Sequence, residues 1–96
     1  MNTILQTSLF RDWLAGLKDA KAKAAILVRI DRAALGNFGD CALVAGGVFE
    51  MRVHVGPGYR VYYVRRGRTV YLLLCGGDKG TQTADIKRAA KLARDV

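Results

Sequence analysis

Apolar residues recur at helical spacing over the first third of the chain. After a short apolar-leaning start at residues 1–6, typical of an edge strand, Thr7 or Ser8 is placed to cap a helix. Its apolar positions are Phe10, Trp13, Leu14 and Leu17. Asp19 is placed to cap a second, alanine-rich helix that runs to about Leu35, with Gly36 as its stop. We therefore expect a helical hairpin with one apolar side. The cations of the second helix, at positions 18, 21, 29 and 32, are expected to remain solvated.

The period falls to two after Gly39, where glycine and β-branched residues replace alanine. This pattern predicts strands near residues 42–45, 48–55, 59–65 and 69–75. Turns follow at Gly56-Pro57-Gly58 and at Arg66-Gly67-Arg68. Thr81 or Thr83 then caps a third helix that reaches the C-terminus. The order of elements predicts a single α+β domain over residues 1–96, with a small twisted antiparallel sheet.

The turn at Gly56–Gly58 sets which residues of the hairpin face each other. A three-residue loop places His54 opposite Arg60 and Arg52 opposite Tyr62, and opposed residues of an antiparallel pair share a face. One face then carries the apolar residues of a core. The other face gathers Glu50, Arg52, His54, Arg60 and Tyr62 on the sheet surface.

The charge of the chain favours a polyanionic partner. Sixteen lysines and arginines against eight acids give a net charge of +8, which suits RNA, DNA or an acidic protein, although solubility alone explains it equally well. Cys41 and Cys75 are expected to be buried, reduced thiols, and with one histidine we expect no metal site and no cofactor. The longest apolar run, Val70–Cys75, is too short to span a membrane. Without a secretion signal at the N-terminus, we expect a cytoplasmic protein.

The polar face of the hairpin has the groups that RNA cleavage requires. His54, as a histidine, can act as the acid or the base, and Arg52 and Arg60 can hold the phosphate and stabilise its transition state. Tyr62 can donate a hydrogen bond or stack on a base. The alternative is an ordinary solvated sheet surface.

A second candidate site is the segment CGGDKGTQTADI, at Cys75–Ile86. Its glycines allow backbone amides to approach an anion, a helix N-terminus follows, and Lys79 adds a cation. The segment is not a P-loop. The alternative is a flexible turn between a strand and a helix.

Two segments resemble the RelE/ParE superfamily of bacterial toxins, most closely its HigB-like addiction module killer group. They read E-x-R-x-H-x-G-P-G-Y-R-x-Y, from Glu50, and G-D-K-x-x-Q-x-x-D-I, from Gly77. The resemblance covers nearly the whole chain. It implies an antitoxin protein as partner, no cofactor, and a ribosome-dependent endoribonuclease that contacts rRNA and cuts mRNA.

The resemblance also implies roles for individual residues. Arg60 matches the phosphate-binding arginine of the family, Arg52 a preceding basic strand position, and Lys79 the basic residue near the end of the last strand. Ile86 stands about where some members have a catalytic tyrosine, so we expect His54 to act in its place. Gln82 and Asp85 are expected to have structural roles, and we assign Arg65, Arg66 and Arg68 to substrate binding. The alternatives are a ParE-like inhibitor of DNA gyrase, or a degenerate toxin that only binds its antitoxin.

Overall fold

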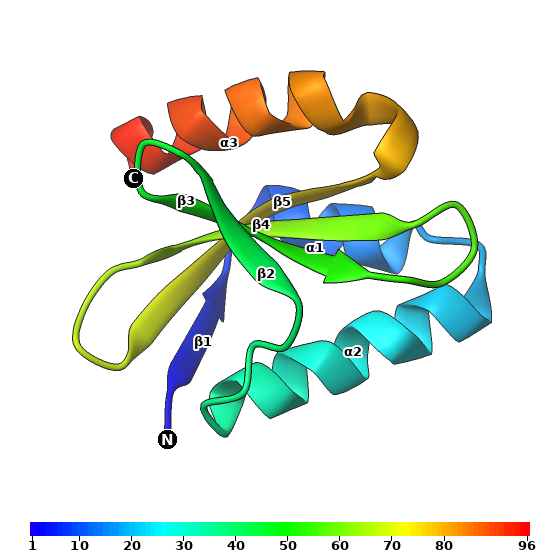
Figure 1. The fold of residues 1–96 in the computed structure, drawn as a ribbon, viewed down its shortest axis with the longest axis horizontal. Coiled ribbons are helices and arrows are strands. Elements are labelled where there is room, and N and C mark those ends of the chain that lie inside the picture. The colour runs from blue at the N-terminus through cyan, green and yellow to red at the C-terminus, as the bar shows by residue number, and fades with distance from the viewer.

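The computed structural model describes residues 1–96 (Figure 1). The strands are β1 (Thr3–Gln6), β2 (Cys41–Ala45), β3 (Val48–Val53), β4 (Tyr59–Arg65) and β5 (Val70–Asp78). The helices are α1 (Ser8–Ala15), α2 (Ala20–Ala34) and α3 (Gln82–Asp95), with a short 3-10 turn, η1 (Lys79–Thr81), before α3. No helix has both the length and the apolar character needed to cross a membrane.

Both helices of the hairpin begin where the sequence predicts, and α2 also ends there, whereas α1 ends at Ala15, before the predicted apolar position Leu17. Thr7 caps α1 because its hydroxyl accepts the Phe10 N–H at 3.0 Å. Asp19 caps α2, and its carboxylate accepts the N–H groups of Lys21 and Ala22, both at 3.1 Å. These side chains satisfy amides that have no partner inside the helix. Gly36, at φ 98°, turns the chain away after α2.

The five strands form one sheet in the order β1-β5-β4-β3-β2. Four strands pair antiparallel, as predicted, but β1 lies parallel to β5, so the sheet is mixed. The predicted edge position of β1 and the α+β class are confirmed. The parallel pair arises because the chain crosses from one edge to the other through the helical hairpin and β2 before it returns.

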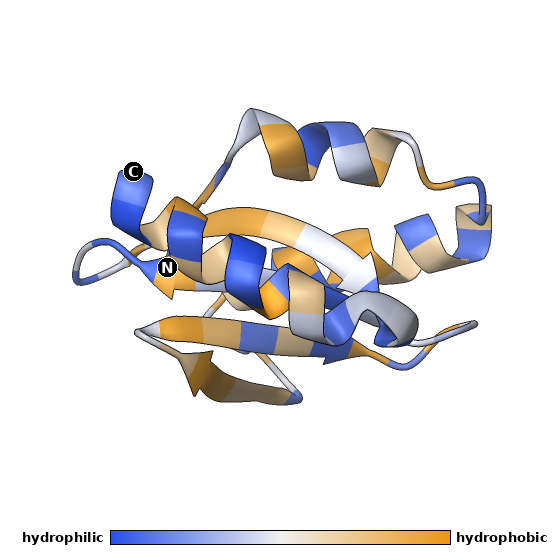
Figure 2. Ribbon diagram, turned by 90° about the horizontal axis from the view of Figure 1, so that it is seen from above, coloured by the Kyte–Doolittle hydropathy of each residue, from blue (hydrophilic) through white to orange (hydrophobic).

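Helices cover both faces of the sheet, with α1 and α2 on one side and α3 on the other (Figure 1). In Figure 2 hydrophobic colour predominates on the strands, with some hydrophilic segments among it, and it alternates with hydrophilic colour along the helices. The larger core lies between the sheet and the α1–α2 hairpin and includes Phe10, Ile26, Met51, Val61 and Leu73. The smaller core, beneath α3, includes Val48, Tyr62, Leu74 and Ala89. The face that the sequence predicted to be a polar surface is therefore partly buried by α3.

Strand β5 continues beyond the predicted end at Cys75, through Gly76 and Gly77 to Asp78. Trp13 of α1 packs on one side of these glycines and Asp85 of α3 on the other. A Cβ on Gly76 would lie 2.4 Å from the Trp13 ring, and one on Gly77 would lie 1.8 Å from Asp85 Oδ2. The two glycines thus allow both helices to approach the strand. They are strand residues and do not form the predicted anion-binding loop.

The β3–β4 hairpin has a longer loop than predicted. Strand β3 ends at Val53, and the chain turns through residues 54–58, with Gly56 and Gly58 at positive φ. The Gly58 N–H donates to the Val55 carbonyl at 3.0 Å. Arg52 is consequently opposite Arg60, and Glu50 is opposite Tyr62. The prediction that His54 pairs with Arg60 was wrong by two residues. A shift of two leaves the side chains on their predicted faces.

Candidate functional site

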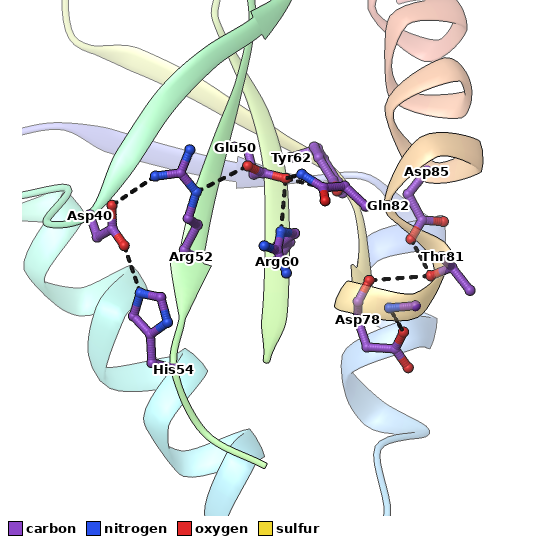
Figure 3. A network of polar contacts seen from close by, with 11 residues as sticks. Asp40, Glu50, Arg52, His54, Arg60, Tyr62, Asp78, Thr81, Gln82 and Asp85 are labelled. Atoms are coloured by element: carbon purple, nitrogen blue, oxygen red, sulfur yellow. Dashed lines mark hydrogen bonds and ion pairs between the residues drawn. The ribbon is translucent and has the colours of Figure 1, made fainter. Parts of the chain in front are cut away.

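A buried carboxylate lies at the centre of the polar network shown in Figure 3. Glu50, on β3, is 1% exposed. Its Oε1 accepts the Tyr62 hydroxyl at 3.2 Å and the Gln82 side-chain amide at 2.8 Å. Its Oε2 accepts the Nε–H of Arg52 at 3.2 Å. Strands β3 and β4 and the first turn of α3 are thereby joined through one side chain.

Arg60 is the second cation beside Glu50. Its Nε lies 3.0 Å from Glu50 Oε1, close enough for an ion pair, but the N–H does not point at the oxygen. We read this contact as a charge interaction, and the buried Nε–H remains without an acceptor. The Arg60 side chain is 13% exposed, and its terminal N–H groups make no hydrogen bond within the protein. A guanidinium of this kind has donors available for an anion.

Tyr62 has a different place from the one predicted. Its side chain is fully buried beneath α3, so it cannot stack on a base at the surface. Burial, and secondly the negative charge of Glu50, raise the pKa of the Tyr62 hydroxyl far above its ordinary value. The hydroxyl therefore stays protonated and donates to Glu50. Within the structure, Tyr62 positions this carboxylate.

Asp40, just before β2, joins Arg52 to His54. Its Oδ1 accepts from Arg52 Nη1 at 3.0 Å and its Oδ2 lies 2.6 Å from His54 Nε2. The hydrogen bond with His54, and then contacts with Arg52, hold the pKa of Asp40 below its usual value of 3.8. The same pairing with Asp40, followed by Glu50, raises the pKa of Arg52. His54 itself is in the β3–β4 loop, with its side chain 72% exposed.

Arg29 of α2 holds the backbone around Asp40 in place. Its guanidinium donates to the carbonyl oxygens of Arg52, of Phe38 at 2.8 Å and of Asp40 at 3.3 Å. The prediction that this arginine is solvated was wrong, because it closes the connection between α2 and β2 against β3. The other cations of α2 are exposed or half-buried at the surface.

Lys79 begins the η1 turn on the Arg60 side of the network. Its N–H donates to the Gly58 carbonyl at 2.8 Å, which ties the turn to the hairpin loop. Its exposed side chain lines a hollow of about 530 Å³ around the start of α3. Lys87 and Gln82 line the same hollow. The Gln82 amide therefore connects this basic hollow to Glu50.

The structure brings together only some of the predicted residues. Arg52 and Arg60 are direct cross-strand neighbours, and Asp40 links His54 to Arg52. Arg65, Arg66 and Arg68 lie at the opposite end of β4, in and beside the β4–β5 turn. Sequence reasoning missed Asp40 and Arg29 and did not give Glu50 a role. Glu50 carried a signal, since it is the lone acid between Cys41 and Gly77 in a strongly basic stretch.

The arrangement favours anion binding over nucleophilic catalysis by a thiol. Burial raises the pKa of the Cys75 thiol to about 11, so it stays protonated at neutral pH. No group of three or more His, Cys, Asp or Glu side chains is placed to hold a metal ion. Two arginines on neighbouring strands, with a histidine next to them, can bind a phosphate and transfer a proton close to it.

Comparison with known proteins points to one family. The model of the family described as "Phage derived protein Gp49-like (DUF891)" matches residues 12–95. An uncharacterised protein of Haemophilus influenzae is 48% identical over 93 residues, which cover 97% of this chain and 94% of that protein. The solution structure of a conserved hypothetical protein of Helicobacter pylori, HP0894, matches with a TM-score of 0.50 at 15% identity. That match covers 83% of this chain and 97% of the other, and it shows that the two proteins share a fold.

Proposed function

Because this chain belongs to the Gp49-like family, a toxin-like family of toxin–antitoxin systems with a RelE-like fold, we propose that it is a toxin that cleaves RNA. Its partner in such a system is an antitoxin protein. The observation that carries the proposal of cleavage is the cluster of Arg52, Arg60 and His54, held by two carboxylates.

The two arginines bind the scissile phosphate. They are opposite each other on β3 and β4, where like charges repel unless an anion lies between them. Glu50 balances part of this charge from inside the protein, and the outer N–H groups of Arg60 have no protein acceptor. Asp40 is the second anion of the cluster, on the Arg52 side. A phosphate approaching from solvent therefore binds first at the free donors of Arg60, and the same donors stabilise the charge that builds up in the transition state.

His54 carries the proton. Asp40 holds its Nε2, which leaves Nδ1 as the nitrogen available to the substrate. Cleavage proceeds by attack of the ribose 2′-oxygen on the adjacent phosphorus, while the bond to the 5′-oxygen breaks. The 2′-hydroxyl loses a proton to a base, and the leaving 5′-oxygen gains one. His54 takes one of these two roles, and Lys79 adds positive charge at the far side of Arg60.

We further propose that the substrate is mRNA on the ribosome and that the site of action is the cytoplasm. The Glu50–Tyr62 and Gly77–Ile86 segments resemble the HigB-like group, whose members act in this way. The net charge of +8 supports binding to rRNA and mRNA.

The proposal is tested by mapping mRNA 5′ ends on translating ribosomes after expression of the chain. Arg60→Ala is expected to reduce cleavage by about 10²–10³-fold, as loss of one transition-state donor does. Arg11→Ala is the matched control, because Arg11 is an exposed arginine of α1 outside the network. Intact mRNA combined with loss of DNA gyrase supercoiling would replace the nuclease with the gyrase-inhibitor alternative.

His54 is tested separately, since it is exposed and its removal leaves the core intact. His54→Ala is expected to reduce cleavage by at least about 10²-fold, the usual contribution of an acid or base. Its thermal unfolding should show only the small loss that follows from removing the exposed pair with Asp40. Cleavage at the original rate would remove His54 from the mechanism.

A further inference from the structure

A second cavity lies at the other end of the sheet, on the face covered by α1 and α2. Its volume is about 240 Å³, and it plays no part in the proposed cleavage. Six residues line it: Phe38, Cys41, Phe49, Tyr63, Arg65 and Tyr71. Four of the six carry an aromatic ring. The four aromatic residues come from three neighbouring strands, β3, β4 and β5, and from the connection between α2 and β2.

The aromatic rings form a fixed stack. Tyr63 is 2% exposed, and its ring is stacked with Phe38 at 5.0 Å and 13° and with Phe49 at 5.5 Å and 18°. Tyr71 is tilted against Phe38, with the ring centres 4.7 Å apart. Phe38, Phe49 and Tyr71 keep part of their surface exposed. A preformed wall of this kind binds a flat ring without losing side-chain freedom.

Arg65 provides a fixed cation on the wall of this cavity. Its Nε–H donates to the Gly67 carbonyl at 2.9 Å and its Nη2 donates to the Arg68 carbonyl at 2.7 Å. These bonds use two of the five N–H groups of the guanidinium and leave the others available. Arg66 is tied to the Ala93 carbonyl of α3 at 3.0 Å, and Arg68 is exposed in the same turn. No carboxylate lines the cavity.

We propose that this aromatic cavity binds one unpaired base of a single-stranded RNA, with its phosphates on Arg65 and Arg68. The cavity is smaller than the roughly 300–1,000 Å³ sites of drug-sized molecules, so it holds a fragment such as a single base. Aromatic faces beside arginines are the usual means of binding single-stranded nucleic acid. The inference rests on the proposed function for the nature of the polymer, and it adds a second contact to the substrate.

The experiment measures binding, so that it is independent of cleavage. A fluorescently labelled single-stranded RNA with 2′-O-methyl groups, which lacks the attacking hydroxyl, is titrated with the whole chain in an anisotropy assay. Phe49→Leu removes a ring and keeps the cavity apolar, and Arg65→Gln removes the charge. Each is expected to weaken binding about tenfold, the usual effect of losing one stacking or ionic contact.

Two controls match these changes. Phe49→Tyr keeps the ring and is expected to retain affinity within about twofold. Arg11→Gln removes one positive charge from α1. Arg11 does not line the cavity, so this substitution is expected to have a similarly small effect. NMR shifts of the Phe38, Phe49 and Tyr71 ring protons in the unsubstituted protein follow the same titration, so the test does not depend on how a variant folds.

Unchanged affinity in both Phe49→Leu and Arg65→Gln, or RNA-induced shifts confined to the surroundings of Arg52, His54 and Arg60, would overturn the proposal. The same holds if only an acidic, apolar peptide of the antitoxin shifts the ring protons. Ring shifts with RNA but no cleavage of unmodified mRNA would sustain this proposal and refute the nuclease. Cleavage of unmodified mRNA without ring shifts would sustain the nuclease and refute the proposal of a base-binding cavity.

Discussion

Glu50 shows how one buried side chain organises the candidate site. Two arginines, a tyrosine and a glutamine converge on its carboxylate from β3, β4 and α3. A buried charge is stable only when such partners compensate for lost hydration. The negative charge is therefore a structural requirement of the site, and it holds both arginine side chains beside it.

Glu50→Ala is expected to lower the free energy of unfolding by about 3 kcal/mol, because Arg60 loses its counter-charge while still largely buried. Glu50→Gln keeps the shape and the contact with Tyr62, so a smaller loss of about 1–2 kcal/mol is expected. Urea denaturation measures both values. Equal stability of all three proteins would show that the carboxylate does not hold the network together.

The pairing of Asp40 with His54 makes the stability of the protein depend on pH in the acidic range. The pKa of Asp40 is lowered in the folded protein, so the stabilisation is present in full above the ordinary value of 3.8 and is lost as the pH falls through the lower folded value. We expect Asp40→Asn to be less stable than the unsubstituted protein at about pH 6, with the difference shrinking below about pH 3. Thermal unfolding across this range measures it. A difference that grows toward low pH would contradict the assignment.

At the scale of elements, the Gly76-Gly77 pair decides how closely two helices approach β5. Trp13 packs against one glycine and Asp85 against the next, from opposite faces of the sheet. The contact with Asp85 sets the start of α3, where Thr81 donates its hydroxyl to Asp85 Oδ2 at 2.5 Å. The position of Gln82, and with it the Glu50 network, follows from this contact.

Gly77→Ala is expected to destabilise the protein by about 3 kcal/mol, at the upper end of the range for overpacking, because the new methyl group overlaps the Asp85 carboxylate. The loss should be smaller in an Asp85→Ala background, where the overlapping group is gone. Gly67→Ala is the control, since its Cβ would make an ordinary contact of 3.6 Å with Val70. Urea denaturation gives all the values, and an equal loss in both backgrounds would refute the explanation.

The helices, the strands and the faces of the hairpin could be predicted from the sequence because each depends on local pattern. The caps at Thr7 and Asp19 and the alternation in β3 and β4 are properties of a few neighbouring residues. The loop length was not determined locally, because either glycine of Gly56-Pro57-Gly58 can begin the turn. The burial of Tyr62 depends on which face α3 covers, and the Asp40–His54 contact depends on a loop held by Arg29. These are tertiary effects.

At the scale of the whole molecule, the cations of the sheet and its turns, six of the sixteen lysines and arginines, lie in two regions. One surrounds Arg52, Arg60 and Lys79, and the other is the turn that carries Arg65, Arg66 and Arg68. Strand β4 runs between them. A single-stranded substrate that contacts both regions would have its affinity set mainly by ionic contacts to phosphates.

The affinity for single-stranded RNA is therefore expected to fall linearly with salt concentration on a logarithmic plot. Each phosphate contact contributes a slope of about −0.7, so Arg60→Ala and Arg68→Ala should each reduce the slope by about that amount. Anisotropy titrations from about 50 to 200 mM salt measure it. Arg94→Ala, in the exposed last turn of α3, is the comparison and should leave the slope unchanged. A slope independent of all three substitutions would exclude ionic contacts at these positions.

The parallel pairing of β1 with β5 has a consequence for how the protein is made. Thr3 pairs with Val70 and Gln6 with Leu73, so the first strand to be synthesised waits for the last one. Contacts between residues so far apart in the chain slow folding, because a long loop must close before they form. Gln82, which completes the Glu50 network, comes later still. A growing chain on the ribosome therefore has neither a complete sheet nor an assembled site until β5 and Gln82 have emerged.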